Sequence, residues 1–205
     1  MKKIITLTIL TLVSFQFTSC KPEEKKTTVK KEVKKPTFSL ENASNSIDFT
    51  AYKTTEKIPV KGKFKKINII KNGKGNTVKE AIHNTEFTIP VSSLFTADVT
   101  RDSKLKQFFF GVMDNTSLLS GKLTITDDTT GIASITMNGI TADLAFTYTI
   151  NDKEFKLNAT MNLDNWNAQK AVDSLNLVCK DLHKAADGVS KTWSDVAINI
   201  TTVFK

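Results

Sequence analysis

Alternation of apolar and polar residues with a period of two constrains the fold of this chain more than any other feature of its sequence. The pattern is longest in the second half, where apolar residues occupy every second position of residues 133–137, 142–150 and 155–163. Such alternation predicts strands that bury one face and expose the other. Asn138-Gly139 separates the first two of these segments, and this dipeptide is a strong signal for the tight turn of a β-hairpin.

The first half carries the same pattern in shorter pieces, over residues 47–51, 58–64, 87–91 and 119–125, and a last piece covers residues 196–200. The phase of the alternation slips at Lys65-Lys66, which predicts a β-bulge there. Pro90 has no amide hydrogen, so it predicts a strand end or an edge strand. Together the eight or so segments predict an all-β fold, either an antiparallel barrel or a sandwich.

Two segments follow a helical period instead. Apolar residues of 103–113 and of 165–184 recur at spacings of three and four, which predicts two amphipathic helices. Asp102 or Ser103 is suited to cap the first turn of the first helix. Helices of this kind pack on a sheet or cover the open end of a barrel, so both are predicted to be accessory to the strands.

The first twenty residues predict export. Lys2 and Lys3 precede an apolar stretch over residues 4–17, and small residues follow, as in a secretory signal peptide over residues 1–19. The apolar stretch is shorter than the ~20 residues that a bilayer span needs. Residues 17–20, Phe-Thr-Ser-Cys, resemble the lipobox of bacterial lipoproteins. That resemblance implies that Cys20 becomes the lipidated N-terminus of a protein anchored in the bacterial cell envelope, facing the periplasm or the cell surface.

The charge of the chain is concentrated outside the predicted domain. The chain carries a formal net charge of +8, of which Lys2 and Lys3 contribute +2 and residues 20–36 contribute +4, leaving +2 for residues 37–205. The Lys-rich composition of residues 20–36 predicts a flexible tether between the anchor and one globular domain over residues 37–205. Because Arg101 is the sole arginine and the domain is nearly neutral, we expect no binding of nucleic acid.

Sequence motifs of catalysis are missing from the chain, which lacks the G-x-S-x-G, H-E-x-x-H, P-loop and G-x-G-x-x-G patterns. We therefore predict no enzyme activity, no catalytic residue, no metal and no cofactor. One pair leaves an alternative open. Cys179 and His183 lie four residues apart in the second predicted helix, where they could ligate a metal or haem iron. The favoured interpretation is structural, with a packed thiol and an imidazole that hydrogen-bonds a carbonyl near the helix end.

Several short motifs resemble the YceI-like family of exported bacterial proteins. The most specific is Thr-Arg-Asp-Ser-Lys-Leu at residues 100–105, followed by Phe108-Phe109, which is similar to the start of the family's helix. The other matching segments lie at residues 47–53, 60–64, 119–125, 137–141 and 193–198. The resemblance covers roughly residues 45–204.

The resemblance implies a lipocalin-like, eight-stranded, up-and-down antiparallel barrel with two accessory helices. It also implies that the barrel binds a long apolar ligand, a polyisoprenoid or similar lipid, for sequestration or transport. The residues then expected to face this ligand are Phe49, Phe64, Phe87, Ile89, Phe109, Leu123, Ile135, Leu144, Phe146, Tyr148 and Leu157. Arg101 either meets the ligand's head group or, as the favoured alternative, belongs with Asp102 to an internal salt bridge or helix-start device.

Two other functions stay open from the sequence. In the first, side chains fill the barrel completely, and the protein acts through its outer surface in adhesion or assembly within the envelope. In the second, Cys179 and His183 serve a redox or cofactor-dependent reaction. An unfilled space inside the barrel would favour the lipid-binding function over the first alternative.

Overall fold

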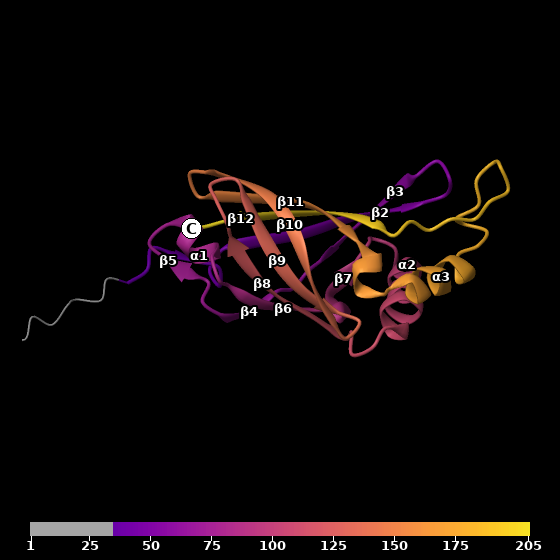
Figure 1. Ribbon diagram of the computed structural model, residues 1–205, viewed down its shortest axis with the longest axis horizontal. Helices are drawn as coiled ribbons and strands as arrows, with labels where there is room; N and C mark the ends of the chain where they lie inside the picture. The colour runs from indigo at the N-terminus through magenta and orange to yellow at the C-terminus, as the bar shows by residue number, and fades with distance from the viewer. Residues whose placement is uncertain (1–34) are drawn as a thin grey trace, which may run out of the picture. The chain divides into compact units, whose positions relative to one another are not determined.

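The alternating segments form one antiparallel sheet of ten strands, which curls around the main core (Figure 1). In order across the sheet the strands are β4 (Asn68–Lys71), β6 (Glu86–Pro90), β8 (Leu118–Ile125), β9 (Thr130–Met137), β10 (Ile140–Asn151), β11 (Glu154–Asn162), β12 (Asp195–Val203), β2 (Ser44–Lys53), β3 (Ile58–Phe64) and β7 (Leu94–Phe95). A separate two-stranded sheet pairs β1 (Phe38–Ser39) with β5 (Lys74–Gly75).

The computed structural model describes residues 35–205, which form one unit. The predicted signal peptide over residues 1–19 and Cys20 lie outside the described residues, as does the predicted tether except for Lys35 and Pro36. In the part of the chain that the structure describes, no helix has the length and apolar character needed to cross a membrane.

The ten strands correspond to eight segments of chain, because two of the segments are interrupted. β4 continues β3 after residues 65–67, and β7 continues β6 after the 3₁₀ turn Val91–Ser93. β3 pairs with β7 while β4 pairs with β6, so the same two segments join the ends of the sheet. Every neighbouring pair is antiparallel, and segments adjacent in the chain are adjacent in the barrel. The predicted up-and-down barrel is therefore confirmed, with two of its strands divided.

The sequence signals at the two breaks have structural counterparts. The phase slip at Lys65-Lys66 marks an interruption between β3 and β4, which is a larger irregularity than the predicted bulge. Pro90 is the last residue of β6, as its missing amide hydrogen predicts. Beyond the break, the first residues of β2 pair with β12 only, because the register of β2 with β3 begins at Ile47 and Phe64. The sheet therefore leaves a gap in hydrogen bonding between the start of β2 and β4.

Within residues 35–205, three α-helices accompany the barrel instead of the predicted two. The additional helix, α1 (Val78–Ile82), begins at Thr77, whose hydroxyl accepts a hydrogen bond from the Glu80 amide at 3.1 Å. In return, a Glu80 carboxylate oxygen accepts from the amide of Asn76 at 2.8 Å. These reciprocal bonds satisfy amides at the helix start, much as a capping box does.

The first predicted helix begins earlier than expected. α2 (Val99–Lys104) is capped by Asp98, whose carboxylate accepts from the Arg101 amide at 3.0 Å, and it continues through a π-helical turn at Leu105–Phe109 and a 3₁₀ turn at Phe110–Val112. The predicted caps Asp102 and Ser103 are wrong. The Asp102 carboxylate accepts instead from the amide and hydroxyl of Thr96, at 2.8 and 2.7 Å.

The second predicted helix is shorter than the range 165–184. A 3₁₀ turn over Leu163–Trp166 ends at Asn167, which has a left-handed backbone with φ 50°, and α3 then spans Gln169–Val178. Of the apolar stripe beyond the helix, Cys179 is still buried, whereas Leu182 is 61% exposed. Residues 180–184 form turns and one isolated β-bridge.

Trp166 joins this turn to the barrel. Its side chain is completely buried, and its indole N–H donates to the carbonyl of Ile135 in β9 at 2.9 Å. The side chain of Asn138 in the β9–β10 turn donates to the carbonyls of Trp166 and Asn167, at 2.9 and 3.2 Å. The predicted hairpin turn therefore also fixes the approach to α3.

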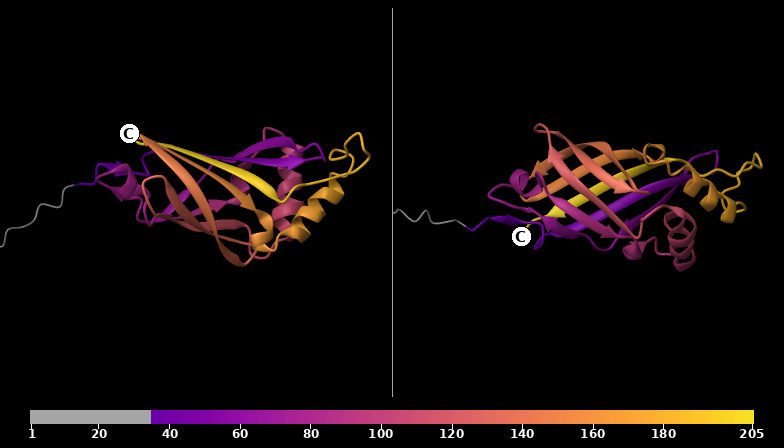
Figure 2. Two further views of the ribbon diagram at one scale, coloured as in Figure 1. Left: turned by 45° about the horizontal axis from the view of Figure 1, so that its top comes forward. Right: turned by 60° about the horizontal axis from the view of Figure 1, so that its bottom comes forward.

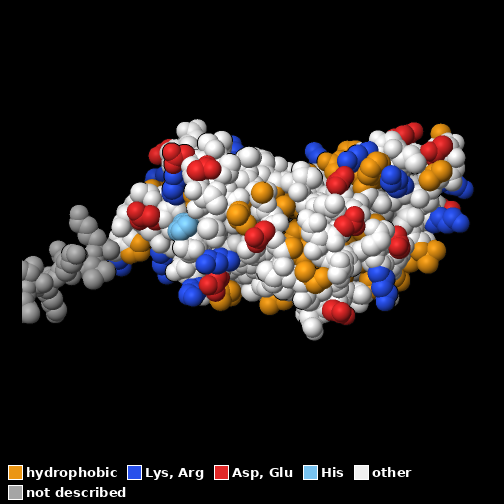
Figure 3. Space-filling model, viewed as in Figure 1, with side chains coloured by type: hydrophobic (Ala, Val, Ile, Leu, Met, Phe, Trp, Pro, Cys, Tyr) orange, Lys and Arg blue, Asp and Glu red, His pale blue; other side chains and the backbone are white. Residues whose placement is uncertain are grey.

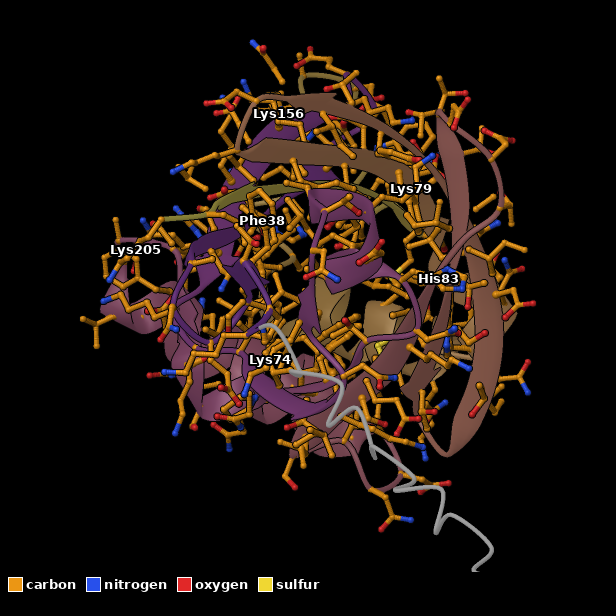
Figure 4. The ribbon with its side chains drawn as sticks, turned by 90° about the vertical axis from the view of Figure 1, so that its left-hand side faces the viewer. Phe38, Lys74, Lys79, His83, Lys156 and Lys205 are labelled. Atoms are coloured by element: carbon orange, nitrogen blue, oxygen red, sulfur yellow. The ribbon has the colours of Figure 1, made fainter. Side chains whose placement is uncertain are left out.

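The two ends of the barrel are covered differently (Figures 1 and 2). α2 and α3 lie at one end beside the tip of the β2–β3 hairpin, and α1 lies at the other with the β1–β5 pair. Figure 4 looks onto this second end, where Phe38, Lys74, Lys79 and His83 are labelled. Ala81 and Ile82 of α1 are almost completely buried there, so α1 closes this end. An opening for a ligand is therefore to be sought beside α2 and α3.

Candidate ligand-binding site

The barrel encloses an apolar cavity of about 190 Å³, here called the barrel cavity. The side chains on its lining that carry polar groups are those of Asn45, Thr192, Trp193 and Thr202. A cavity that is almost free of hydrogen-bonding groups gives water little to bind, whereas apolar ligands can occupy it. An engineered cavity of ~150 Å³ admits benzene, so this space suffices for an apolar group of at least that size.

Ten of the residues expected to face a ligand lie on the wall of the barrel cavity: Phe49, Phe64, Phe87, Ile89, Phe109, Leu123, Ile135, Leu144, Phe146 and Leu157. All but Phe109 come from strands, where they occupy the inward phase of the alternation. Their contact with a ligand stays a prediction.

Tyr148 and Arg101 do not line the barrel cavity. Tyr148 is buried deeper in the core, 5.3 Å from Phe155 between ring centroids, and its hydroxyl donates to the carbonyl of Asp127 at 2.7 Å. A buried tyrosine needs such an acceptor, and the β8–β9 turn supplies it. Arg101 lies on α2 with its guanidinium 3.5 Å from the Asp98 carboxylate and 3.4 Å from the carbonyl oxygen of Thr96. A salt bridge at the helix start therefore forms, but the partner of Arg101 is Asp98 and not the expected Asp102.

The sequence prediction missed further residues of the cavity wall. Strand β12 contributes Val196, Ile198 and Ile200, and the two helical segments contribute Leu105, Phe110, Val172 and Leu175. The alternation of apolar residues in β12 predicted a strand, and the same alternation indicates which of its residues face the interior. The helical stripes signalled packing, but a stripe does not show whether it faces other side chains or an empty space.

Glycines opposite phenylalanines keep the cavity open. In the strand register Phe49 lies opposite Gly62 and Phe146 lies opposite Gly131. A methyl group on Gly62 would stand 2.3 Å from Cζ of Phe49, and one on Gly131 would stand 2.2 Å from Cζ of Phe146. Each ring therefore lies flat over its glycine, a cross-strand arrangement that covers the exposed glycine backbone. Rings held against the wall occupy less of the barrel's interior.

A second pocket of about 470 Å³, here called the mouth pocket, adjoins the barrel cavity at the end that carries α2 and α3. Residues of the β2–β3 hairpin, of α2 and α3 and of the segment after α3 line it: Phe49, Ala51, Tyr52, Lys53, Pro59, Val60, Lys61, Asp98, Thr100, Arg101, Lys104, Leu105, Leu175, Cys179, Leu182, His183 and Thr192. Five of these also line the barrel cavity, namely Phe49, Ala51, Leu105, Leu175 and Thr192. The two spaces therefore share a wall, and the mouth pocket offers the cavity a route to solvent.

A smaller pocket of about 380 Å³ lies at the gap between β2 and β4. It shares Asn45, Ile47, Phe64 and Ile67 with the barrel cavity, and Lys65, Lys66 and Glu41 contribute to its rim. The interruption of β3 thus brings a second, more polar recess against the cavity wall.

Cys179 and His183 both line the mouth pocket, but their environments suit packing and hydrogen bonding. Burial raises the pKa of the Cys179 thiol, which favours the protonated form over the thiolate that reacts or binds metals. Burial also lowers the pKa of His183 to about 4, and its Nδ1 lies 2.7 Å from the Thr192 hydroxyl. The partner is thus a hydroxyl, not the predicted carbonyl. No group of three or more His, Cys, Asp or Glu side chains within residues 35–205 could hold a metal ion.

The neutral state of His183 predicts a loss of stability in acid. The folded protein binds the imidazole proton near pH 4 and the unfolded chain near pH 6.5, so between these values the unfolded chain holds more protons. The contribution of His183 is complete above pH 6.5 and is lost as the pH falls toward 4. Urea unfolding at pH 7.5 and at pH 4.5 measures this loss. Between these two pH values, the free energy of unfolding should fall further in the native protein than in the His183→Gln variant. Equal losses in the two proteins would show that His183 protonates as readily when folded.

Known proteins share features of both the sequence and the fold of this chain. Residues 38–204 match the family model of the YceI-like domain. The structure is similar to that of a polyisoprenoid binding domain from Saccharophagus degradans implicated in plant cell wall breakdown, with a TM-score of 0.60 and 10% identity over 83% of this chain and 98% of that chain. It is also similar to BcnA of Burkholderia cenocepacia, with a TM-score of 0.51 and 13% identity over 81% of this chain and 98% of that chain. A search of the curated proteins finds no match.

Proposed function

Because the chain belongs to the YceI-like domain family, and because its barrel holds an apolar cavity, we propose that it binds a long apolar ligand, a polyisoprenoid or similar lipid, for sequestration or transport. The observation that carries the proposal is the nearly unbroken apolar lining of the barrel cavity. The related fold of the domain from Saccharophagus degradans, which is described as polyisoprenoid binding, adds support.

Affinity in such a site comes from removal of the ligand's chain from water. Each methylene group that leaves water contributes ~0.8 kcal/mol, so a short stretch of prenyl chain suffices for binding without a hydrogen bond. A long chain would extend from the barrel cavity into the mouth pocket, which continues the apolar wall through Ala51, Leu105 and Leu175. The cavity favours this function over a filled barrel that acts only through its surface.

We further propose that the protein is an exported lipoprotein, anchored in the cell envelope through Cys20. The support lies in the sequence of residues 1–20, with its two lysines, its apolar stretch and its small residues before the cysteine. The Lys-rich residues 20–36 would then separate the domain from the membrane. Metabolic labelling with a fatty acid analogue should label the native chain, whereas a Cys20→Ser variant should stay unlabelled.

The lipid-binding proposal is tested by mass spectrometry of the full chain, expressed with export and purified gently. Native spectra before and after lipid extraction should show one ligand per chain, beyond any lipid attached covalently. The extract should contain a long-chain apolar molecule such as a polyprenyl lipid. A protein that carries no exchangeable lipid and also fails to bind added prenyl compounds would contradict the proposal and favour the filled-barrel alternative.

A further inference from the structure

Cationic side chains gather in the mouth pocket, beside the apolar cavity. Lys53 continues the inward phase of β2 beyond Phe49 and Ala51, and Arg101 and Lys104 come from the facing helix α2. Asp98 is the one acidic residue among the residues that line this pocket. Figure 3 shows basic, acidic and apolar side chains interspersed on the visible face of this end of the molecule.

The protein's own groups leave much of this positive charge unpaired. Asp98 is occupied by Arg101, at 3.5 Å. The Lys53 ammonium donates to the carbonyl of Leu182 at 3.0 Å, which leaves two of its three N–H donors available. Among residues 35–205, the Lys104 ammonium has neither a hydrogen bond nor an ion pair. The pocket therefore holds more donors and more positive charge than the protein itself satisfies.

The charges of these same cations influence the pKa values of two groups in the pocket. Burial is the main cause that lowers the pKa of His183, and the charges of Lys53 and Lys104 lower it further. Burial raises the pKa of Cys179, and the charges of Lys104, Lys53 and Arg101 oppose that rise. The three cations thus act on one small region between α2, α3 and the end of β2. Because His183 is neutral, it adds no charge of its own.

We infer that the ligand is a single-chain amphiphile with an anionic head group, a phosphate or a carboxylate, held by Lys53, Lys104 and Arg101 while its chain enters the barrel cavity. This inference rests on the proposed lipid-binding function and adds the chemical class of the head group. Charge-assisted hydrogen bonds from ammonium and guanidinium groups to phosphate or carboxylate are among the stronger polar contacts in proteins.

The geometry supports an anion over a neutral head in two ways. The mouth pocket shares its wall with the barrel cavity, so a chain in the cavity places its head among the cations. Like charges close together in a partly buried space repel one another, and an anion bound among them offsets that repulsion. A hydroxyl head group would leave the repulsion in place.

The experiment compares three ligands that share one chain and differ in the head group: geranylgeranyl phosphate, geranylgeranoic acid and geranylgeraniol. Each is titrated by calorimetry into the full chain after its bound lipid has been removed. We expect at least one anion to bind 10-fold or more tightly than the alcohol, with an advantage that shrinks as salt rises from 50 to 500 mM. The tighter anion identifies the head group as phosphate or carboxylate.

Charge-removing variants locate the site. Lys104→Gln and Lys53→Gln should each weaken binding of the preferred anion about 5- to 10-fold, because each removes one positive charge from the pocket. Binding of the alcohol should weaken by less than binding of the anion in both variants. Lys63→Gln is the matched control, because Lys63 is exposed on the outer face of β3, opposite Asp48.

The outcomes separate the two proposals. Equal affinity for the anions and the alcohol, or full affinity for the anion in the variants, would overturn the head-group inference and leave lipid binding intact. Failure of all three ligands to bind to a folded protein would overturn both. A loss with Lys63→Gln equal to that with Lys104→Gln would indicate attraction by the net charge alone and would also overturn the assigned site.

Discussion

Replacement of Trp166 by alanine is expected to lower the free energy of unfolding by about 3–5 kcal/mol, the range found for large aromatic side chains removed from protein cores. The Trp166 side chain is completely buried between the turn that leads into α3 and the barrel wall. Its removal leaves a cavity in the core and eliminates the hydrogen bond from the indole to the Ile135 carbonyl. Urea unfolding followed by circular dichroism measures the change.

The variant Trp166→Phe separates the contribution of core packing from that of the indole hydrogen bond. Phenylalanine keeps much of the apolar volume but cannot donate to the Ile135 carbonyl, so this variant should lose less stability than the alanine variant. If Trp166→Ala were as stable as the native protein, the turn before α3 would not be held by this side chain. The assignment of Trp166 as the connection between turn and barrel would then be wrong.

Replacement of Ala51 by phenylalanine is expected to weaken ligand binding about 10- to 100-fold, since overpacking of a filled site costs about 1–3 kcal/mol and each 1.4 kcal/mol is a factor of ten. Ala51 lies on the wall that the barrel cavity and the mouth pocket share. A ring at this position would occupy the passage between the two spaces. Titration of the delipidated protein with geranylgeraniol measures the effect without involving the charged groups.

Thr50→Phe is the control for this substitution. Thr50 is the neighbour of Ala51 on the same strand, and successive side chains of a strand point to opposite faces, so its ring would stay outside the barrel. Binding should be unchanged in Thr50→Phe, and both variants should remain folded. Full affinity in a folded Ala51→Phe protein would show that ligands enter elsewhere, with the recess between β2 and β4 as the remaining candidate.

The strands of this fold were predictable because a barrel strand has only two faces. Once Phe49 and Ala51 are assigned to the interior, the period of two determines the direction of every residue in β2. The period of two likewise predicted that Leu144 and Phe146 face the interior, and both lie on the cavity wall. Lys53 shares the inward phase and lies at the mouth of the barrel.

The helices were less predictable because their limits depend on tertiary contacts. Asp98 and Asp102 are both good caps by sequence, and the choice between them follows from Thr96, which binds the Asp102 carboxylate. α1 was missed although Thr77 and Glu80 have the spacing of a capping box. A helix of five residues leaves too short an apolar stripe to be seen beside the surrounding strands.

The cavity itself could not be predicted, because it depends on register. That Gly62 stands opposite Phe49 and Gly131 opposite Phe146 follows from the pairing of strands, which the sequence does not state. Tyr148 shows the converse case. Its alternation phase is that of Phe146, yet the depth of its position and the acceptor at Asp127 assign it to the core.

The glycines opposite phenylalanines also have a consequence for how ligand preference can change within the family. The three atoms nearest to a methyl group at Gly62 would all belong to the ring of Phe49, so that ring would have to swing toward the lumen and shorten the space open to a chain. Gly62 itself does not line the barrel cavity. Preference for long or short chains can therefore diverge between related barrels through residues that a comparison of ligand contacts alone would overlook.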